Sequence, residues 1–531
     1  MKCKPSCDQQ STHIVNNTLM PHIQLITLNA RYIHASLGLR YLYANMAELQ
    51  THTLLAEYTI EQRPEDIVES LLQHSDTRII GFGVYIWNVN QTLEVMRLVK
   101  VIRPDIKLVI GGPEVSYEID EQVITSVADF IIPGAADHEF TQLCKDILED
   151  NPPAKIVTAL PLKLDNLRSP YTYYSDEDLA HRVIYVEASR GCPFKCEFCL
   201  SSLDKTATAF NLEAFLADMQ DLLNRGARQF KFVDRTFNLK AETSRRILQF
   251  FLDHIEAGAQ NDSSAKQQLF LHFELIPDRL PDPLLELLPR FPKNSLQFEI
   301  GIQSFNADVQ QRISRKQQHE KTCHNLRWLR ANTHAHIHAD LIFGLPGENL
   351  ESFGEGFDLL HSLGPQEIQV GILKRLRGTP IARHTRDYDM RYMSTPPYRI
   401  LAHSEASFDT VQRMVRFARY WDLIGNSGRF NTALPLLLDK KPFEQFMHLS
   451  DWLFKTTTQT HRIALPKLFD LLCKHLIEER KLDEQLVHDA LLQDFKHNKL
   501  KGTPAFLATD WHKQKNKSTS KAIRQQRHAT Y

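Results

Sequence analysis

The sequence is poor in cysteine, has no long apolar run and carries almost no net charge. Eight cysteines in 531 residues are too few for a disulfide-built scaffold, which favours a reducing cytoplasm. No apolar stretch reaches the roughly 18–20 residues of a membrane span, and the polar N-terminus has no secretory core. The net charge of −1 creates no global field for polyanions. We therefore expect a cytoplasmic protein, with neither a membrane nor nucleic acid as its partner.

Two stretches of the chain alternate short β-branched runs with amphipathic helical segments, at residues 21–150 and 182–397. This alternation predicts parallel sheets joined by right-handed crossovers. The fold class is therefore α/β. We expect a doubly wound, flavodoxin-like sheet in the first stretch. The second has six units, too few for the closed eight-stranded barrel, and predicts a partial (β/α)6 barrel.

The remaining segments show less regular patterns. Residues 151–181 have several prolines and tyrosines and are predicted to form a linker. Residues 398–500 show helical spacing and predict a helical C-terminal domain, which we expect to cap the barrel mouth. Residues 1–20 and 501–531 are expected to be a disordered tail and a basic tail.

Three closely spaced cysteines give the strongest chemical signal. Cys192, Cys196 and Cys199 lie in "SRGCPFKCEFCLSS", and no fourth cysteine follows nearby. The group comes directly after the first predicted barrel strand, at the end of the barrel where such folds place chemistry. A structural zinc site uses four ligands, whereas a cubane held by three cysteines keeps one iron open for direct binding of a substrate. The spacing therefore favours an iron–sulfur cluster over zinc.

The CxxxCxxC motif, with Phe198 before its third cysteine and six β/α units around it, resembles the radical S-adenosylmethionine (SAM) superfamily. The resemblance implies a 4Fe-4S cluster whose open iron chelates the amino and carboxylate groups of SAM. Reductive cleavage of SAM then yields a 5′-deoxyadenosyl radical. An electron donor such as a flavodoxin or ferredoxin is implied as a partner.

The same resemblance assigns SAM contacts to the ends of later strands. Asp234 in "FVDRTFN" matches a position near the SAM amino group, although the glycine pair usual there is absent. Arg315 in "ISRK" matches an arginine that pairs with the SAM carboxylate, a suitable bidentate contact. "DLIFGLPGE" resembles the loop that borders adenine. The SAM-binding residues expected from the resemblance are Phe198, Asp234, Glu274, Gln303, Arg315, Gly344 and Leu345. No catalytic residue can be assigned.

The N-terminal series resembles the cobalamin-binding domain fused ahead of many radical SAM barrels, and one subfamily with an uncharacterised helical C-terminal domain. The segments "LNARYIHASLGLRYL", "GFGVYIWN" and "GGPEVS" carry the likeness. The cobalt-ligating D-x-H-x-x-G motif is missing, and "PGAADHEF" replaces an acidic G-E-G-E. Domains without the ligating motif hold cobalamin with its base off the cobalt; the alternative is a degenerate domain kept for packing. The cobalamin-binding residues expected from the resemblance are Tyr32, His34, Gly83, Tyr85, Trp87, Gly111, Gly112, Pro113, Glu114 and Gly134.

Three alternating histidines, His334, His336 and His338, share one face of a predicted strand. Two of them could converge on a second metal, but no further ligands accompany them. We interpret them as polar residues of the barrel wall.

The resemblance implies methylation, or another radical modification, of an unactivated carbon in an unknown substrate. One alternative is an enzyme like the transfer RNA methylthiotransferases, whose phosphate contacts the basic tail could supply. Such enzymes need a second cluster held by three N-terminal cysteines, and Cys3, Cys7 and Cys144 have the wrong distribution. The other alternative is a non-catalytic cobalamin or redox sensor.

Overall fold

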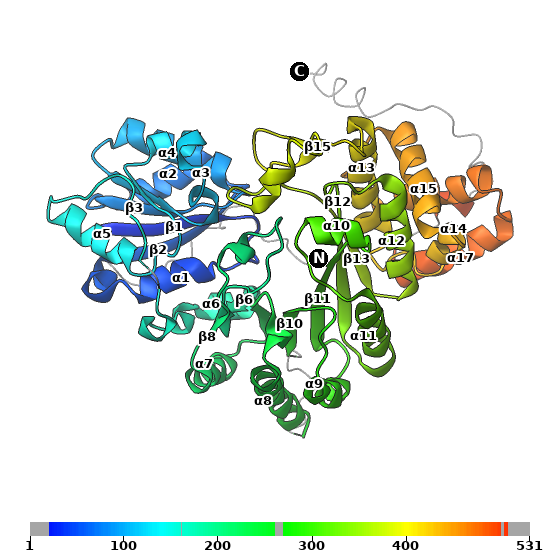
Figure 1. The fold of residues 1–531 in the computed structure, drawn as a ribbon, viewed down its shortest axis with the longest axis horizontal. Helices are drawn as coiled ribbons and strands as arrows, with labels where there is room; N and C mark the ends of the chain where they lie inside the picture. Colours follow the sequence, from blue (N-terminus) through cyan, green and yellow to red (C-terminus); the bar gives the residue numbers. More distant parts are fainter. Residues whose placement is uncertain (1–20, 161, 261–268, 501–503, 508–531) are drawn as a thin grey trace, which may run out of the picture.

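Figure 1 shows the computed structural model of the chain, which describes residues 21–160, 162–260, 269–500 and 504–507. Cys3, Cys7 and most of both predicted tails lie outside the described residues. Within the described ranges, no helix has the length and apolar character that a membrane crossing requires.

The N-terminal part is a five-stranded parallel sheet with strand order β2-β1-β3-β4-β5, which confirms the predicted flavodoxin-like winding. Every residue of β1 is buried because helices cover both faces of the sheet. Helices α2, α3 and α4 pack on one face, and α1 and α5 pack on the other. The strands are β1 (Ile23–Asn29), β2 (Thr53–Thr59), β3 (Ile79–Gly83), β4 (Lys107–Gly111) and β5 (Phe130–Ile132). The helices are α1 (Leu37–Ala44), α2 (Pro64–Leu72), α3 (Val89–Ile102), α4 (Val123–Val127) and α5 (Glu139–Leu148).

The central part is a six-stranded parallel sheet in the order β13-β12-β11-β10-β9-β6, which confirms the predicted partial barrel. Burial alternates along β10, β11 and β12, so apolar side chains face the surrounding helices and polar ones face the lumen. The strands are β6 (Ile184–Val186), β9 (Gln229–Phe232), β10 (Phe270–Leu275), β11 (Leu296–Gln303), β12 (His336–Phe343) and β13 (Glu367–Ile372). The helices are α7 (Leu212–Asn224), α8 (Ala241–Gln260), α9 (Asp282–Leu287), α10 (Ala307–Arg312), α11 (His319–Asn332) and α12 (Leu350–Ser362).

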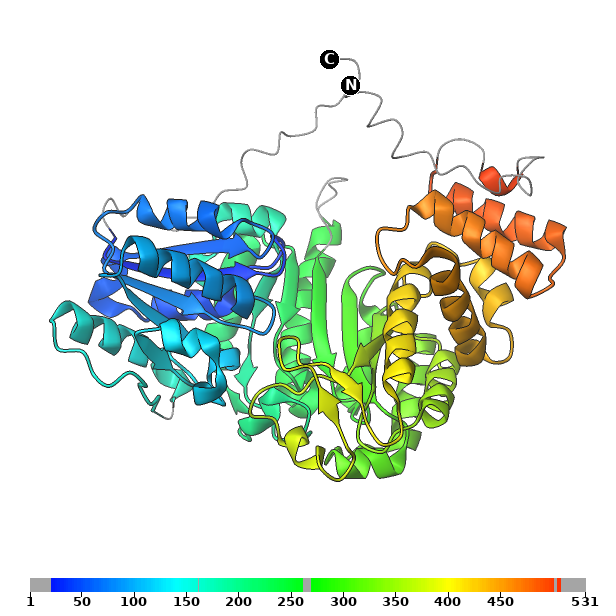
Figure 2. The ribbon, with the colours of Figure 1, turned by 90° about the horizontal axis from the view of Figure 1, so that it is seen from above.

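The C-terminal part is helical, but it does not cap the barrel mouth as expected. A hairpin of β14 (Arg391–Tyr392) and β15 (Ile400–Ala402) comes first, and helix begins only at Phe408. The helices lie along the edge of the sheet, where α13 contacts β13 and α15 contacts α12 (Figures 1 and 2). Phe357 of α12 packs edge to face against Phe417 and against Trp421, so these helices share the barrel core. The helices are α13 (Phe408–Ile424), α14 (Ala433–Leu438), α15 (Pro442–Thr457), α16 (Leu465–Lys474) and α17 (Glu484–His497).

The segment predicted as a linker, residues 151–181, is packed against both neighbouring parts. The backbone of Ile156 pairs with β5, and Tyr171 and Tyr174 are buried in the barrel core. Helix α6 (Asp176–His181) follows, with Ser175 and Asp178 forming a capping box. The low hydrophobic periodicity of this segment therefore reflects short, irregular elements, which are packed against the rest of the protein.

Candidate functional site

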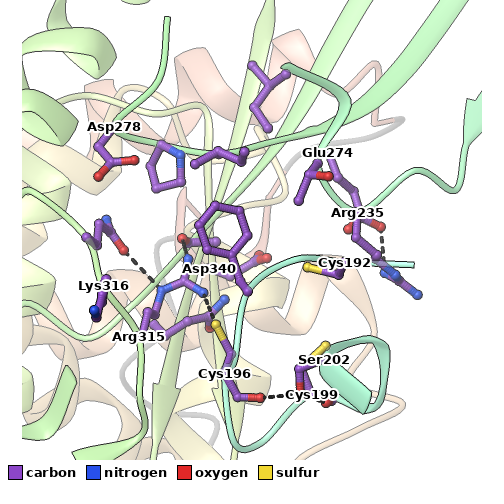
Figure 3. A pocket seen from close by; sticks show the side chains of 18 of the residues that line it. Cys192, Cys196, Cys199, Ser202, Arg235, Glu274, Asp278, Arg315, Lys316 and Asp340 are labelled. Atoms are coloured by element: carbon purple, nitrogen blue, oxygen red, sulfur yellow. Dashed lines mark hydrogen bonds and ion pairs between the residues drawn. The ribbon is translucent and has the colours of Figure 1, made fainter. Parts of the chain in front are cut away.

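The three cysteines lie on one loop at the carboxyl ends of the barrel strands and line a single cavity (Figure 3). Two short strands, β7 (Ser189–Arg190) and β8 (Thr208–Ala209), pair antiparallel and close the loop. The Cys192 amide donates to the carbonyl of Asp204 at 2.9 Å. The Ser202 hydroxyl donates to the carbonyls of Cys196 and Cys199. The cysteine loop is therefore a folded turn with its own hydrogen bonds.

The thiols of this loop fit an iron–sulfur cluster. Burial raises the pKa of Cys192 and Cys196, and the Arg315 guanidinium, 3.4 Å from the Cys196 sulfur, opposes the rise at Cys196. In the described part of the chain, no three or more His, Cys, Asp or Glu side chains surround one point as ligands of a single ion. A cubane needs no such convergence, because each thiolate binds a different iron.

The structure brings four of the seven predicted SAM residues to the cysteine cavity: Phe198, Glu274, Gln303 and Arg315. Arg315 also donates to the Gly301 carbonyl and to Gln317. Gln303 has a left-handed backbone, φ 73°, at a register shift in β11. Its buried Oε1 atom has no hydrogen-bond partner in the structure, as a group that awaits a ligand would.

Five further charged residues, which the sequence analysis did not assign, line the cavity: Arg235, Asp278, Glu299, Lys316 and Asp340. Arg235 pairs with Glu274 at 2.7 Å. Hydrogen bonding to His272, opposed by burial, lowers the pKa of Glu299 to about 2. Burial, together with the nearby acids Glu299 and Glu274, raises the pKa of Asp340 well above its usual range. The period-two spacing of polar residues along β11 and β12 was the signal that could have found Glu299 and Asp340. Arg235, Asp278 and Lys316 lie in loops outside the strands, where no such pattern applies.

The other three predicted SAM residues do not reach this cavity. Asp234 accepts hydrogen bonds from the Ala188 amide and the Ser189 hydroxyl, and burial raises its pKa to about 7. Leu345 is fully buried, and Gly344 packs against Ile400 of β15. Asp234 is therefore bonded to the chain just before the cysteine loop, and Gly344 and Leu345 are packed directly after the end of β12.

Two of the three alternating histidines, His336 and His338, lie on β12 and belong to the barrel wall. His336 lies 3.0 Å from Glu367, and His338 lies 3.3 Å from Asp340. His334 is exposed at the opposite end of the barrel from the cysteines.

A second hollow lies at the carboxyl ends of the N-terminal strands. Five of the ten predicted cobalamin residues line it, namely Gly83, Tyr85, Gly111, Gly112 and Gly134. Gly112 has φ 109°, and a Cβ atom there would lie 2.6 Å from the Val84 carbonyl oxygen. Bare glycine backbone and apolar side chains therefore leave a crevice open, as a large flat cofactor requires.

The other five predicted cobalamin residues lie elsewhere. Glu114 is buried against Arg377 and Tyr398, which follow the last barrel strand, so it joins the N-terminal domain to the rest of the chain. Tyr32 donates to Glu177, and His34 lies 2.8 Å from the Tyr185 hydroxyl. Two lie beside the crevice without lining it: Trp87, stacked on Tyr85, and Pro113, which begins a short 3-10 helix.

Arg190 connects the two hollows. It lines the crevice and precedes Cys192 of the cavity by two residues. Its guanidinium pairs with Glu187 at 2.8 Å and with Asp137 at 3.3 Å, and lies over the Tyr41 ring. These contacts set the crevice of one domain beside the cysteine loop of the other.

Comparison with known proteins agrees with this division. Residues 186–360 match the radical SAM superfamily, residues 23–143 match the B12 binding domain, and residues 386–531 match a protein family of unknown function (DUF4080). The solved structure of OxsB, a cobalamin-dependent S-adenosylmethionine radical enzyme, aligns with a TM-score of 0.61 at 14% identity. The alignment covers 94% of this chain and 84% of that one, and it shows a shared fold.

Two curated relatives match at 23% identity. The 2-(S-pantetheinyl)-carbapenam-3-carboxylate methyltransferase of Streptantibioticus cattleyicolor aligns over 55% of this chain and 46% of its own length. The cobalamin-dependent radical SAM methyltransferase TokK of Streptomyces tokunonensis aligns over 56% and 47%. The chain thus spans about half the length of these relatives. Residues 186–360 therefore form a radical SAM domain, and residues 23–143 ahead of it form a B12-binding domain.

Proposed function

We propose that this protein is a cobalamin-dependent radical SAM methyltransferase that methylates an unactivated carbon of its substrate. The observation that carries the proposal is the cavity that unites three thiols with Gln303 and Arg315, beside a glycine-lined crevice. The relatives named above support methyl transfer as the outcome.

Each hollow has a role in this proposal. Cys192, Cys196 and Cys199 hold the 4Fe-4S cluster, Arg315 binds the SAM carboxylate, and Gln303 offers its unpaired oxygen to a SAM donor. When bound, cluster and SAM supply a 5′-deoxyadenosyl radical, and cobalamin supplies a methyl group. The protein residues hold these groups in adjoining hollows and exclude water.

In this function each domain keeps the boundaries predicted from the sequence and has its own task. Residues 21–150 hold cobalamin, and residues 182–397 hold the cluster and SAM. Residues 398–500 support the barrel edge. An external electron donor and a cytoplasmic location, where thiols stay reduced, complete the proposal; all six described cysteines are free.

The methylthiotransferase alternative is less well supported. It needs a second cluster, and Cys144 is fully buried in the apolar core between α5 and the sheet. Exposing that thiol would disrupt the packing of α5. A non-catalytic sensor makes a different prediction, because it would bind SAM without consuming it.

The test is anaerobic reconstitution with iron, sulfide and cobalamin, followed by SAM and a strong reductant. We expect 5′-deoxyadenosine together with S-adenosylhomocysteine, and we expect Cys196→Ser to abolish the first product. The matched control is Cys323→Ser, which alters a buried cysteine of α11 outside the cavity. Bound SAM with no 5′-deoxyadenosine would contradict the proposal and favour the sensor.

A further inference from the structure

Glu197 stands between Cys196 and Phe198, and each of its polar groups is bound to a part of the chain outside the cysteine loop. Its amide donates to the Ile313 carbonyl at 3.0 Å, and its carbonyl accepts from the Ile381 amide at 2.9 Å. The residue is 3% exposed. Both backbone contacts lie more than a hundred residues away along the chain, so tertiary packing alone creates them.

The carboxylate of Glu197 has three partners. Its Oε1 atom accepts from the Ser314 hydroxyl at 2.6 Å and from Arg383, and its Oε2 atom lies 2.8 Å from Nε2 of His384. A buried carboxylate is costly unless it is paired in this way. Ser314 and Arg383 come from different elements, so one side chain joins three segments.

Apart from the contact of Arg315 with the Cys196 sulfur, the other hydrogen bonds described above for the loop are internal to it, from the Cys192 amide to Asp204 and from Ser202 to two cysteine carbonyls. Glu197 therefore anchors the folded loop to the barrel. It also fixes Ser314, whose left-handed backbone, φ 54°, precedes Arg315 and its contact with the Cys196 sulfur. Movement of Glu197 would displace both the sulfurs and this guanidinium.

We propose that Glu197 is a positioning residue that sets the placement of the three cysteine sulfurs and of Arg315. This inference deepens the proposed function and rests on it, since the group to be positioned is the iron–sulfur cluster. Glu197 does not line the cavity, so it acts through its neighbours.

The test compares Glu197→Ala and Glu197→Gln with wild type after anaerobic reconstitution. The readouts are the rate of iron loss to a chelator and the change that SAM produces in the electron paramagnetic resonance spectrum of the reduced cluster. Glu197→Ala should lose iron about tenfold faster and give a diminished spectral change. Glu197→Gln should fall between it and wild type, because an amide oxygen still accepts from Ser314 and Arg383. The control is Glu213→Gln, which alters an exposed glutamate paired with Arg246.

Ser314→Ala and His384→Ala keep the inference falsifiable if Glu197→Ala does not fold. Each removes one partner of the carboxylate, and each should speed iron loss. Iron loss and SAM response equal to wild type in all folded variants would overturn the proposal alone. A wild-type protein that takes up no cluster would instead overturn the proposed function, and this inference with it.

Discussion

Two buried acceptor atoms without hydrogen-bond partners distinguish the residues of the barrel end: Gln303 Oε1 and Glu348 Oε2. Gln303 belongs to the cysteine cavity, where a ligand can pair with its oxygen. Glu348 lies outside the cavity and accepts a hydrogen bond from Ser304 through its other oxygen. Burial raises the pKa of Glu348 to about 8, which favours the protonated acid. An unpaired buried acceptor thus indicates a binding site at Gln303 and a neutral acid at Glu348.

Arg315→Lys should weaken SAM binding. A lysine keeps the charge but loses the planar fork that can hold a carboxylate and the Gly301 carbonyl together. We expect a loss of about 1.5–3 kcal/mol of binding free energy, measured by anaerobic titration calorimetry on protein with full iron content. Arg245→Lys, at an exposed pair with Glu242, is the control. Equal affinity in the three proteins would exclude Arg315 as a SAM ligand.

Glu348→Gln should remove a pH dependence of stability. Burial raises the pKa of Glu348 from 4.5 to about 8, so the folded state retains a proton that the unfolded chain releases. Wild-type stability should therefore fall as pH rises from 4.5 to about 8, by at most about 1.4 kcal/mol per pH unit. Urea unfolding across that range measures the slope. Parallel curves for wild type and variant would show that Glu348 is ionised in the folded protein.

At the scale of elements, the turn after β4 performs two tasks. Gly111 and Gly112 line the crevice, and the 3-10 helix that follows, Pro113–Val115, carries Glu114 to the barrel. Glu118, a few residues further, pairs with Arg375 and Arg377. One short segment therefore shapes a binding surface and docks its domain.

Gly112→Ala should destabilise the protein and close part of the crevice. The new Cβ would meet the Val84 oxygen at 2.6 Å, in addition to the strain of φ 109°. We expect a loss of about 1–3 kcal/mol in the free energy of unfolding, with weaker cobalamin binding by absorbance.

Gly226→Ala serves as the control that separates the contact with the Val84 oxygen from the strain of a positive φ. Gly226 has φ 104°, but a Cβ atom there would meet nothing within 4 Å. The Gly112 variant should cost more than the Gly226 variant. Equal losses would show that the backbone conformation, and not the Val84 oxygen, accounts for the effect.

At the scale of the whole molecule, a buried network of four charges joins the N-terminal sheet to the barrel. Arg40 pairs with Glu57 and Asp178, each at 2.7 Å, and Arg182 pairs with the same two acids at 3.0 Å. The residues come from α1, β2, α6 and the start of the barrel region. The segment predicted as a linker, residues 151–181, thus forms one side of an interdomain junction.

Arg40→Met should leave two buried carboxylates with one cation, at a cost of about 3–5 kcal/mol in the free energy of unfolding. The control is Arg97→Met at an exposed helical pair with Glu94, which should change stability by less than about 1 kcal/mol. Chemical denaturation of both variants measures the difference. Equal stability of the two would refute a structural role for the network.

Acid should weaken the same junction. Burial alone would raise the pKa of Glu57 and Asp178, but Arg40 and Arg182 outweigh it, so both are lowered. Their contribution is fully present above the unfolded pKa of roughly 4 and is lost as pH falls through the lower folded values. Limited proteolysis of residues 151–181 at decreasing pH would reveal the opening. A junction that resists cleavage until global unfolding would contradict this expectation.

Patterns within single elements could be predicted from the sequence. The alternating runs located the five N-terminal and six barrel strands, and the cysteine spacing located the loop, because both depend on residues near one another. Phe198, Glu274, Gln303 and Arg315 could be assigned by resemblance because each stands at a strand end or in the loops beyond. The resemblance could not show that Arg235 lines the cavity and Asp234 does not, since two neighbouring residues differ there only in the direction of their side chains.

The strands and the cysteine loop could be predicted from local patterns alone, because hydrophobic period and motif spacing depend on residues near one another. The role of Glu114 in domain docking follows only from the folded chain, since its partner Arg377 is 263 residues away. Tertiary structure likewise placed Arg190 against Asp137, 53 residues apart, and so set the two hollows side by side. Such contacts between distant residues follow from how the domains pack, which no local pattern encodes.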